Sequence, residues 1–286
     1  MSETINLPET IYTPDSQMRS PGLLLRSMWA DMKGSRELSW RLFRRDLSAQ
    51  YRQSLFGVLW AFVPPIITSI IFILLQSRNI VNFGETEIPY PVYVLVGTIL
   101  WQLFVESLNA PLKSVTAARA MLVKINFPRE SLIMSAVYLT LFNMLIKMVV
   151  LVVIFIFFRV PLHWGMLLAP VAIFMLMLLG ITLGLLLTPL GMLYTDVATS
   201  LPVIASLWFF VTPVVYPPPE AFPYSLVAVL NPVTPLLMAA RDLLTLGEIS
   251  NLPWFILVSV LTVIGLFFAW VLYRIALPII IERMSA

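Results

Sequence analysis

SLIMSAVYLTLFNMLIKMVVLVVIFIFF fills residues 131–158 and carries a single charge, Lys147. A helix needs about 20 mostly apolar residues to cross the roughly 30 Å hydrocarbon core of a bilayer, so this run is long enough to do so. The whole chain has the same character, because its 286 residues are 59% hydrophobic and only 12% charged. Soluble proteins are about 25% charged. We therefore expect an all-α integral membrane protein.

Five further apolar runs accompany this one. The predicted transmembrane helices are residues 56–76, 91–111, 131–158, 165–190, 198–216 and 254–274. Residues 56–286 would then form one domain of six transmembrane helices. Between the last two, residues 217–253 are interrupted by prolines into pieces too short to cross. Exposed backbone is costly in lipid, so these pieces are predicted to be short re-entrant helices; the alternative is a loop folded on the outer surface.

The distribution of positive charge predicts the orientation. Of the 18 lysines and arginines, all but Arg78, Lys147, Arg159 and Arg241 lie in the N-terminal segment, in the loop before residue 131 or in the C-terminal tail. Cytoplasmic segments of membrane proteins carry an excess of these residues. Both termini are therefore expected in the cytoplasm, together with the basic loop between the second and third spans.

Residues 1–55 precede the first span and mix apolar with basic positions. In residues 37–55, apolar side chains such as Leu42 and Phe43 are expected to face lipid while Arg44 and Arg45 meet anionic headgroups. This composition is typical of an amphipathic helix lying in the membrane interface. The alternative is a solvated basic arm.

Sequence motifs for catalysis are absent. The chain has no G-x-x-x-x-G-K-[ST] phosphate loop, so it is not expected to hydrolyse nucleotide. It has no cysteine and a single histidine, His163, which excludes histidine- or cysteine-based metal sites. Nucleic acid is not an expected partner, because the basic residues cluster beside the spans. We predict neither an enzyme nor a metal protein.

Two charges fall within predicted spans, where each is expensive. Glu106 and Lys147 are expected to pair or to line a polar cavity, and a proton relay is the alternative. Gly180 and Gly184 have the G-x-x-x-G spacing that permits close helix contact. Aromatic residues near the spans either pack between helices or line a channel whose rings stack on sugars. The candidates for a channel wall are Trp60, Trp101, Phe104, Trp208, Phe209 and Tyr216.

Several motifs together resemble the polysaccharide-exporting permeases of type-2 ABC exporters. In chain order they are Phe43-Arg-Arg-Asp-Leu47, Tyr51-Arg-Gln-Ser-Leu-Phe-Gly-Val-Leu-Trp60, Lys124-Ile-Asn-Phe-Pro-Arg-Glu130, Thr212-Pro-Val-Val-Tyr-Pro217 and Leu230-Asn-Pro232. The resemblance runs from about residue 37 to the C-terminus. One departure is Thr195, where the family usually has an arginine before the aspartate.

The resemblance implies a homodimer in the bacterial inner membrane with two ATP-binding cassette subunits, which bind the ATP and magnesium. The pair of permeases would form a channel for a lipid-linked glycan such as O-antigen, a lipopolysaccharide component. Residues implied to contact the ATPase are Lys113, Arg119, Lys124, Asn126, Phe127, Pro128, Arg129 and Glu130. Residues implied to gate the lipid head are Arg44, Arg45, Asp46, Tyr51 and Arg52.

Three other functions remain open at this point. One is a type-2 exporter of small hydrophobic molecules, which would share the ATPase partner. A second is a membrane-embedded glycolipid-processing enzyme, which would need clustered acidic or histidine residues at a membrane face to bind metal and phosphate. The third is a proton-coupled secondary transporter, which usually shows internal repeats and more intramembrane ionisable residues.

Overall fold

The computed structural model describes residues 21–52, 57, 60, 62–81, 86–125, 127–219 and 221–285, and this part of the chain is helical without strands. The helices are α2 (Pro21–Gly34), α3 (Arg36–Tyr51), α4 (Val63–Ser77), α5 (Tyr90–Ala117), α6 (Arg119–Lys124), α7 (Glu130–Phe158), the 3₁₀ turn η2 (Trp164–Leu167), α8 (Ala169–Leu193), α9 (Thr195–Val211), α10 (Tyr224–Leu230), α11 (Val233–Thr245) and α12 (Leu252–Ser285).

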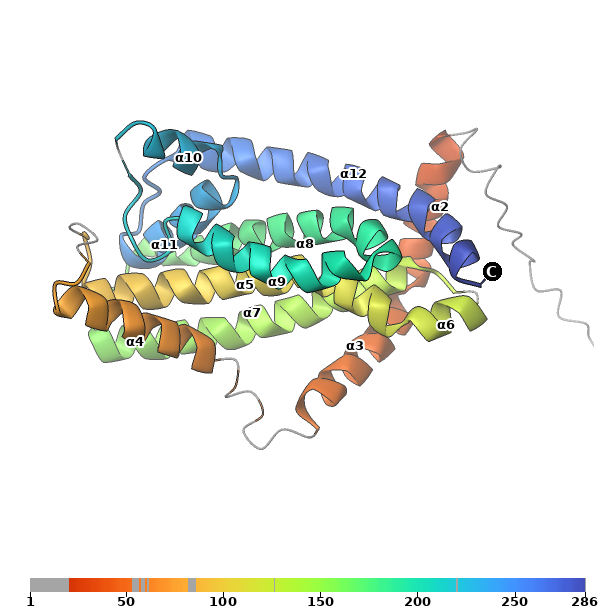
Figure 1. Cartoon of the computed structure of the whole chain (residues 1–286), viewed down its shortest axis with the longest axis horizontal. Coiled ribbons are helices and arrows are strands. Elements are labelled where there is room, and N and C mark those ends of the chain that lie inside the picture. The colour runs from red at the N-terminus through yellow and green to blue at the C-terminus, as the bar shows by residue number, and fades with distance from the viewer. Residues whose placement is uncertain are drawn as a thin grey trace, which may run out of the picture.

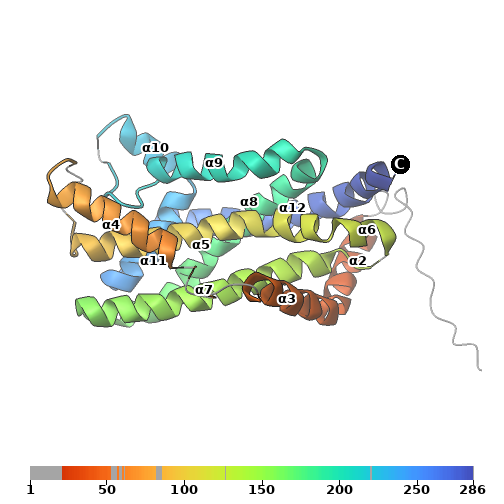
Figure 2. The ribbon, with the colours of Figure 1, turned by 60° about the horizontal axis from the view of Figure 1, so that its bottom comes forward.

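The long helices α5, α7, α8 and α12 run along one axis and form the body of the molecule (Figures 1 and 2). Helices α10 and α11 lie at one end of this body, and α2, α3 and α6 lie at the other. The C-terminal end of α12 returns to the end that holds α2 (Figure 1). Different helices therefore meet at the two ends of the body.

Helix α8 lies at the centre of the packing, against α5 on one side and α12 on another. Its contact with α5 is close because Gly180 and Gly184 face that helix. A Cβ atom on Gly184 would lie 2.2 Å from the carbonyl oxygen of Leu108, and one on Gly180 would lie 2.6 Å from Cβ of Ser107. The predicted G-x-x-x-G contact is therefore present within the chain.

Within the described part of the chain, four helices are long and apolar enough to cross a membrane: α5, α7, α8 and α12 over Leu252–Arg283. Helices α10 and α11 are bent by 85° at a short break and form either one broken span, which would be a fifth crossing, or a re-entrant loop as predicted for residues 217–253. Helices α4 and α9 coincide with the predicted first and fifth spans but have only 15 and 17 residues. Helix length therefore does not confirm the predicted six crossings.

The predicted boundaries differ from the observed ones mostly where proline intervenes. The first span, expected from residue 56, has its described helix from Val63, with prolines in its first turn. The fifth ends at Val211 because Thr212 precedes Pro213 and is extended, as a residue before proline prefers. Two helices are longer than predicted: α5 continues past Pro111 to Ala117, and α12 continues to Ser285.

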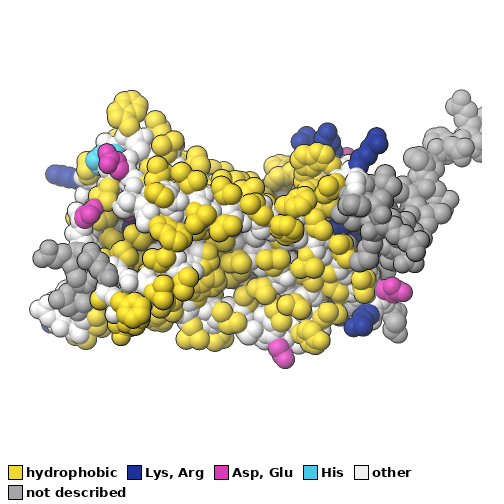
Figure 3. Space-filling model, turned by 90° about the horizontal axis from the view of Figure 1, so that it is seen from above, with side chains coloured by type: hydrophobic (Ala, Val, Ile, Leu, Met, Phe, Trp, Pro, Cys, Tyr) yellow, Lys and Arg dark blue, Asp and Glu magenta, His cyan; other side chains and the backbone are white. Residues whose placement is uncertain are grey.

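The surface matches a membrane protein. In Figure 3 hydrophobic side chains cover the long middle of the visible face, and most charged side chains gather toward its two ends. Outward residues of α7 and α12 are apolar and exposed, for example Phe157 at 79% and Phe268 at 63%. A continuous exposed apolar surface of this kind would be unfavourable in water and is expected where lipid is the solvent.

The N-terminal helices depart from one expectation. Leu42 and Phe43 of α3 are buried rather than facing lipid. The Phe43 ring packs at 6.2 Å between centroids against both Tyr138 and Phe142 of α7. Part of the apolar face of α3 is therefore used to hold this helix on α7, while Trp40 remains 53% exposed.

Candidate coupling site

The end of the molecule that holds α2 and α6 contains a second hydrophobic cluster, separate from the central core. Leu122 of α6, Leu132 of α7, Leu185 of α8 and Leu277 of α12 contribute to it. Helix α6 buries Leu122 in this cluster and exposes Arg119 and Lys124 at its two ends. The short helix therefore presents basic side chains while its own apolar side chain ties it to the long helices.

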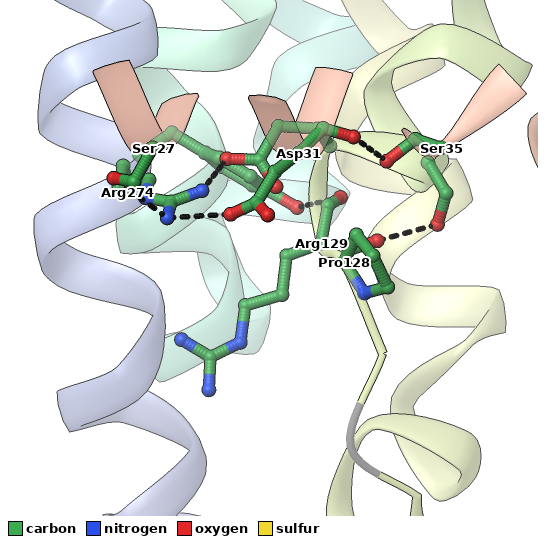
Figure 4. A network of polar contacts seen from close by, with 9 residues as sticks. Ser27, Asp31, Ser35, Pro128, Arg129 and Arg274 are labelled. Atoms are coloured by element: carbon green, nitrogen blue, oxygen red, sulfur yellow. Dashed lines mark hydrogen bonds and ion pairs between the residues drawn. The ribbon is translucent and has the colours of Figure 1, made fainter. Parts of the chain in front are cut away.

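An ion-pair network joins three segments beside this cluster. Arg274 of α12 donates through Nη1 to the carboxylate of Glu130 at the start of α7. Its Nη2 lies 2.6 Å from Oδ2 of Asp31 in α2 and 3.3 Å from Oγ of Ser27. Figure 4 shows Arg274 beside these two α2 residues, with the side chain of Arg129 pointing away from them. The Tyr273 hydroxyl adds a 3.3 Å hydrogen bond to the backbone carbonyl of Arg129.

The network is buried, so each of its charges depends on its partner in the network. Arg274 and Glu130 expose only 8% and 3% of their side chains, and Asp31 exposes 17%. Removing one member of a buried ion pair costs about 3–5 kcal/mol because the other charge is left without compensation. Arg274 therefore fixes the first described helix and the start of α7 to α12.

The predicted ATPase-contact residues divide into exposed and internal groups. Arg119 and Lys124 are exposed on α6, and Lys113 is exposed on α5. Phe127, Pro128 and Arg129 are half-buried, and Glu130 is buried. Asn126 lies outside the described residues. Within this chain Glu130 thus belongs to the internal ion network, so the surface available to a partner is the α6 side.

The predicted lipid-head residues lie on the second half of α3 and just beyond it. Arg44, Arg45 and Arg52 are exposed, and Arg45 pairs with Asp46 at 2.8 Å. Tyr51 is the last residue of α3, and its side chain lies outside the described part. The exposed arginines are consistent with contact to anionic headgroups.

Four of the predicted channel aromatics pack on one another. The Trp101 ring lies 5.3 Å from Phe104, 6.4 Å from Trp208 and 5.8 Å from Phe209. Trp101 and Phe104 are only 6% and 0% exposed, so in this single chain they occupy the core. Trp60 differs, with 56% of its surface exposed.

Tyr216, the sixth candidate, lies at the opposite end of the molecule. It belongs to a hydrogen-bonded group, here called the clamp, that contains Tyr93, Thr212, Tyr216, Asn231 and Arg241. Its carbonyl accepts a 2.9 Å hydrogen bond from the Tyr93 hydroxyl. Arg241 of α11 lies over the Tyr93 ring, 3.8 Å from its centroid, and donates at 3.1 Å to the carbonyls of Pro213 and Val214. Sequence reasoning missed this role, because Arg241 stands among mostly apolar residues between the last two predicted spans and no local motif indicates its partners.

Asn231 completes the clamp. Its Oδ1 accepts from the Trp208 indole and from the backbone N–H of Val233, both at 3.1 Å, and its Nδ2 donates to the Thr212 hydroxyl at 2.8 Å. The Thr212–Pro217 and Leu230–Pro232 motifs, separate in sequence, are thus bound to each other. They hold the end of α9 against the bend between α10 and α11.

The two intramembrane charges form a pair. Lys147 Nζ donates to Oε2 of Glu106 at 2.5 Å, which joins α7 to α5. Lys147 is 4% exposed and Glu106 is 36% exposed at the side chain, so one side of the pair is accessible. Pairing was one of the three expectations for these residues.

Residues 37–245, from α3 to α11, match the ABC-2 type transporter family. The chain belongs to this family of membrane permeases. It is 28% identical over 203 residues to the O-antigen export system permease protein RfbA of Myxococcus xanthus, covering 68% of this chain and 75% of that protein. Two proteins of the same description from Klebsiella pneumoniae are 26% and 25% identical over 234 residues, covering 78% of this chain and 86% of each.

Family membership confirms the resemblance seen in the sequence motifs. It identifies a multi-pass transporter permease rather than an enzyme, and membership of an ABC family implies an ATP-binding cassette partner. Among the described residues, no group of three or more histidine, cysteine, aspartate or glutamate side chains is placed to hold a metal ion.

Proposed function

We propose that this chain is the channel-forming permease subunit of an ABC transporter that exports a lipid-linked polysaccharide across the bacterial inner membrane. The observation that carries this proposal is the match to the ABC-2 family together with relatives described as O-antigen export permeases. ATP would be hydrolysed by two copies of a separate subunit, and two copies of this chain would enclose the channel. Both termini would be cytoplasmic, with six crossings that include the short helices α4 and α9.

The ion network suggests how ATPase movement would reach the membrane helices. An ATPase bound to the exposed side of α6 would displace the adjoining start of α7. Because Glu130 is tied to Arg274 and Arg274 to Asp31, the displacement would pass to α12 and α2 together. Because the ion pairs hold α2, α7 and α12 together, these helices would move as one unit.

Two observations bear on the competing functions. A small-molecule exporter of the same family would have a similar coupling end, so only the relatives and the exposed ring of Trp60 favour a polysaccharide. A glycolipid-processing enzyme would require acidic or histidine clusters, and transporter-family membership favours a permease instead.

The test begins with purification of the tagged chain from native membranes in mild detergent, followed by mass spectrometry of bound proteins and lipids. We expect an ATP-binding subunit and a lipid-linked glycan. Recovery of the ATPase with only small hydrophobic molecules would favour the alternative exporter. Recovery without an ATPase, under conditions that preserve known ABC complexes, would contradict the proposal.

A paired variant tests the coupling surface. Arg119→Glu with Lys124→Glu reverses two exposed charges of α6 and should reduce ATPase association and glycan export without changing the thermal stability of the permease. Unchanged ATPase association and unchanged export in this variant would show that α6 is not the contact.

A further inference from the structure

A polar cavity of about 560 Å³ lies between α3, α5 and α7, away from the ion network of Arg274. Its volume is within the range of about 300–1,000 Å³ that is common for small-molecule sites. More than half of its lining residues have polar side chains, which is unusual beside helices that otherwise face lipid. The polar side chains that matter here are Asp46, Glu106, Lys113, Ser114, Thr140 and Asn143.

The cavity lies at the level expected for headgroups of the inner leaflet. Lys113 is close to the end of α5 at Ala117, and Glu106 lies seven residues nearer the middle, or about 10 Å at about 1.5 Å per residue. The third wall is the second half of α3, the helix that carries the exposed arginines Arg44 and Arg45. The cavity thus extends from the predicted cytoplasmic interface toward the Glu106–Lys147 pair.

Several groups that line this cavity have unused hydrogen-bonding capacity. Within the described part of the chain, the ammonium of Lys113 and the amide of Asn143 have no hydrogen-bond or ion-pair partner. Glu106 is engaged through Oε2 only, and Asp46 through Oδ1 only. Glu106 and Asn143 lie within helices that otherwise face lipid, where unsatisfied polar groups are costly, and Lys113 adds an exposed cation beside them. This combination points to a polar ligand.

The charges of the cavity restrict the chemistry of that ligand. The Asp46 carboxylate is already neutralised by Arg45, and that of Glu106 by Lys147. Lys113 therefore leaves one positive charge, which suits a phosphate. The free oxygens of the two carboxylates accept hydrogen bonds and suit an N–H donor. A neutral sugar would leave the positive charge of Lys113 without a counter-charge. An anion that lacks an N–H donor would leave the free carboxylate oxygens without a hydrogen-bond partner.

We propose that this cavity binds the head of a membrane phospholipid that carries both a phosphate and a primary ammonium, as phosphatidylethanolamine does. The phosphate would lie at Lys113 and the ammonium at the free Oδ2 of Asp46 on α3. Asn143 can donate to the phosphate or accept from the ammonium. The bound lipid would fill the space between α3 and the bundle and would fix the angle of α3 at the interface.

The test measures lipid retention rather than export, so its result is independent of the transported substrate. The full-length chain is reconstituted in nanodiscs made with equal parts of phosphatidylethanolamine, phosphatidylcholine and phosphatidylglycerol. Lipids that remain bound after transfer to detergent are then counted by native mass spectrometry. We expect phosphatidylethanolamine to be retained about tenfold over the other two, because a trimethylated head cannot donate N–H bonds and a glycerol head has no ammonium.

Two single variants assign the site. Lys113→Gln and Asp46→Asn should each reduce the preference to about twofold or less, while their thermal stabilities in detergent stay near that of the parent. Matched controls are Lys33→Gln on α2 and Asp196→Asn on α9, which remove exposed charges outside the cavity and should keep the full preference. Equal retention of the three lipids by the parent chain would overturn the proposal.

Two further outcomes would also overturn it. A preference for phosphatidylethanolamine that survives both cavity variants would place the lipid elsewhere on the chain. A preference for phosphatidylglycerol that is lost in Lys113→Gln but kept in Asp46→Asn would show a phosphate site without an ammonium site.

Discussion

Arg274 shows how a single side chain can connect distant segments. Its planar guanidinium presents several N–H donors in a fixed arrangement, so it contacts Glu130, Asp31 and Ser27 at once. A lysine would offer one compact charge on a flexible stem and could not reproduce this geometry. The residue therefore acts as a structural junction of α2, α7 and α12 rather than as a positive charge of the C-terminal tail.

Replacement of Arg274 by methionine should destabilise the chain by about 3–5 kcal/mol, because Glu130 would remain buried without its cation. The midpoint of thermal unfolding in detergent measures the effect. Arg283→Met is the matched control, since Arg283 is exposed on the same helix, and it should cost less than about 1 kcal/mol. Adding Glu130→Gln to Arg274→Met should restore part of the loss. Equal shifts for the two arginine variants would contradict the assigned role.

The aromatic residues give a second prediction at this scale. Trp101→Ala should lower stability by about 3–5 kcal/mol, because it leaves a cavity beside Phe104 and Trp208. Trp60→Ala removes an exposed ring and should change stability by no more than about 0.5 kcal/mol. If Trp60 guides the polymer, this variant should nevertheless slow glycan export at normal expression. Normal export by Trp60→Ala would contradict a role for this ring in the channel.

At the scale of elements, the contact between α5 and α8 depends on the absence of side chains. Gly184→Ala should destabilise the chain by about 1–3 kcal/mol, because the new Cβ atom would lie 2.2 Å from a backbone oxygen of α5 and the helices would have to separate. Gly34→Ala is the control: nothing lies within 4 Å of a Cβ atom there, and alanine favours a helix by about 0.5–1 kcal/mol. The two substitutions should therefore shift the unfolding midpoint in opposite directions. A Gly184→Ala midpoint equal to or above that of the parent would contradict the close contact.

The sequence predicts these elements to different degrees. The third span was expected at residues 131–158 and is Glu130–Phe158, because a long run with a single charge leaves little choice of boundary. Residues 217–253 were predicted to form short re-entrant helices, but the position of the bend between α10 and α11 was not predicted, since it depends on the extended Asn231 before Pro232 and on the clamp around it. Arg274 and Glu130 are far apart in sequence, and neither side chain has a local pattern that reveals its partner. Their pairing follows from how α12 packs, which no single segment specifies.

At the scale of the whole molecule, charge and length give complementary information about topology. Basic residues gather at the end of the body that holds α2 and α6, but among the described residues only four helices are individually long enough to cross. Helices α4 and α9 become crossings if the bilayer thins locally or if the clamp and the proposed second copy of the chain cover their ends. The side of the membrane on which each loop lies decides whether α4 and α9 cross.

The chain contains no cysteine, so each introduced cysteine is a unique thiol for a membrane-impermeant maleimide. If six helices cross, Arg78→Cys, Arg159→Cys and Glu248→Cys should be labelled from outside intact spheroplasts. Lys124→Cys and Asp196→Cys should be labelled only after the membrane is opened. All five positions are exposed, so failure to label reports the side of the membrane rather than burial. Two neighbouring loops lie on the same side only when the helix between them fails to span. Labelling of Asp196→Cys from outside, as for Glu248→Cys, would therefore mean that α9 does not cross. Protection of Arg78→Cys, on the side of the N-terminal segment, would mean that α4 does not cross.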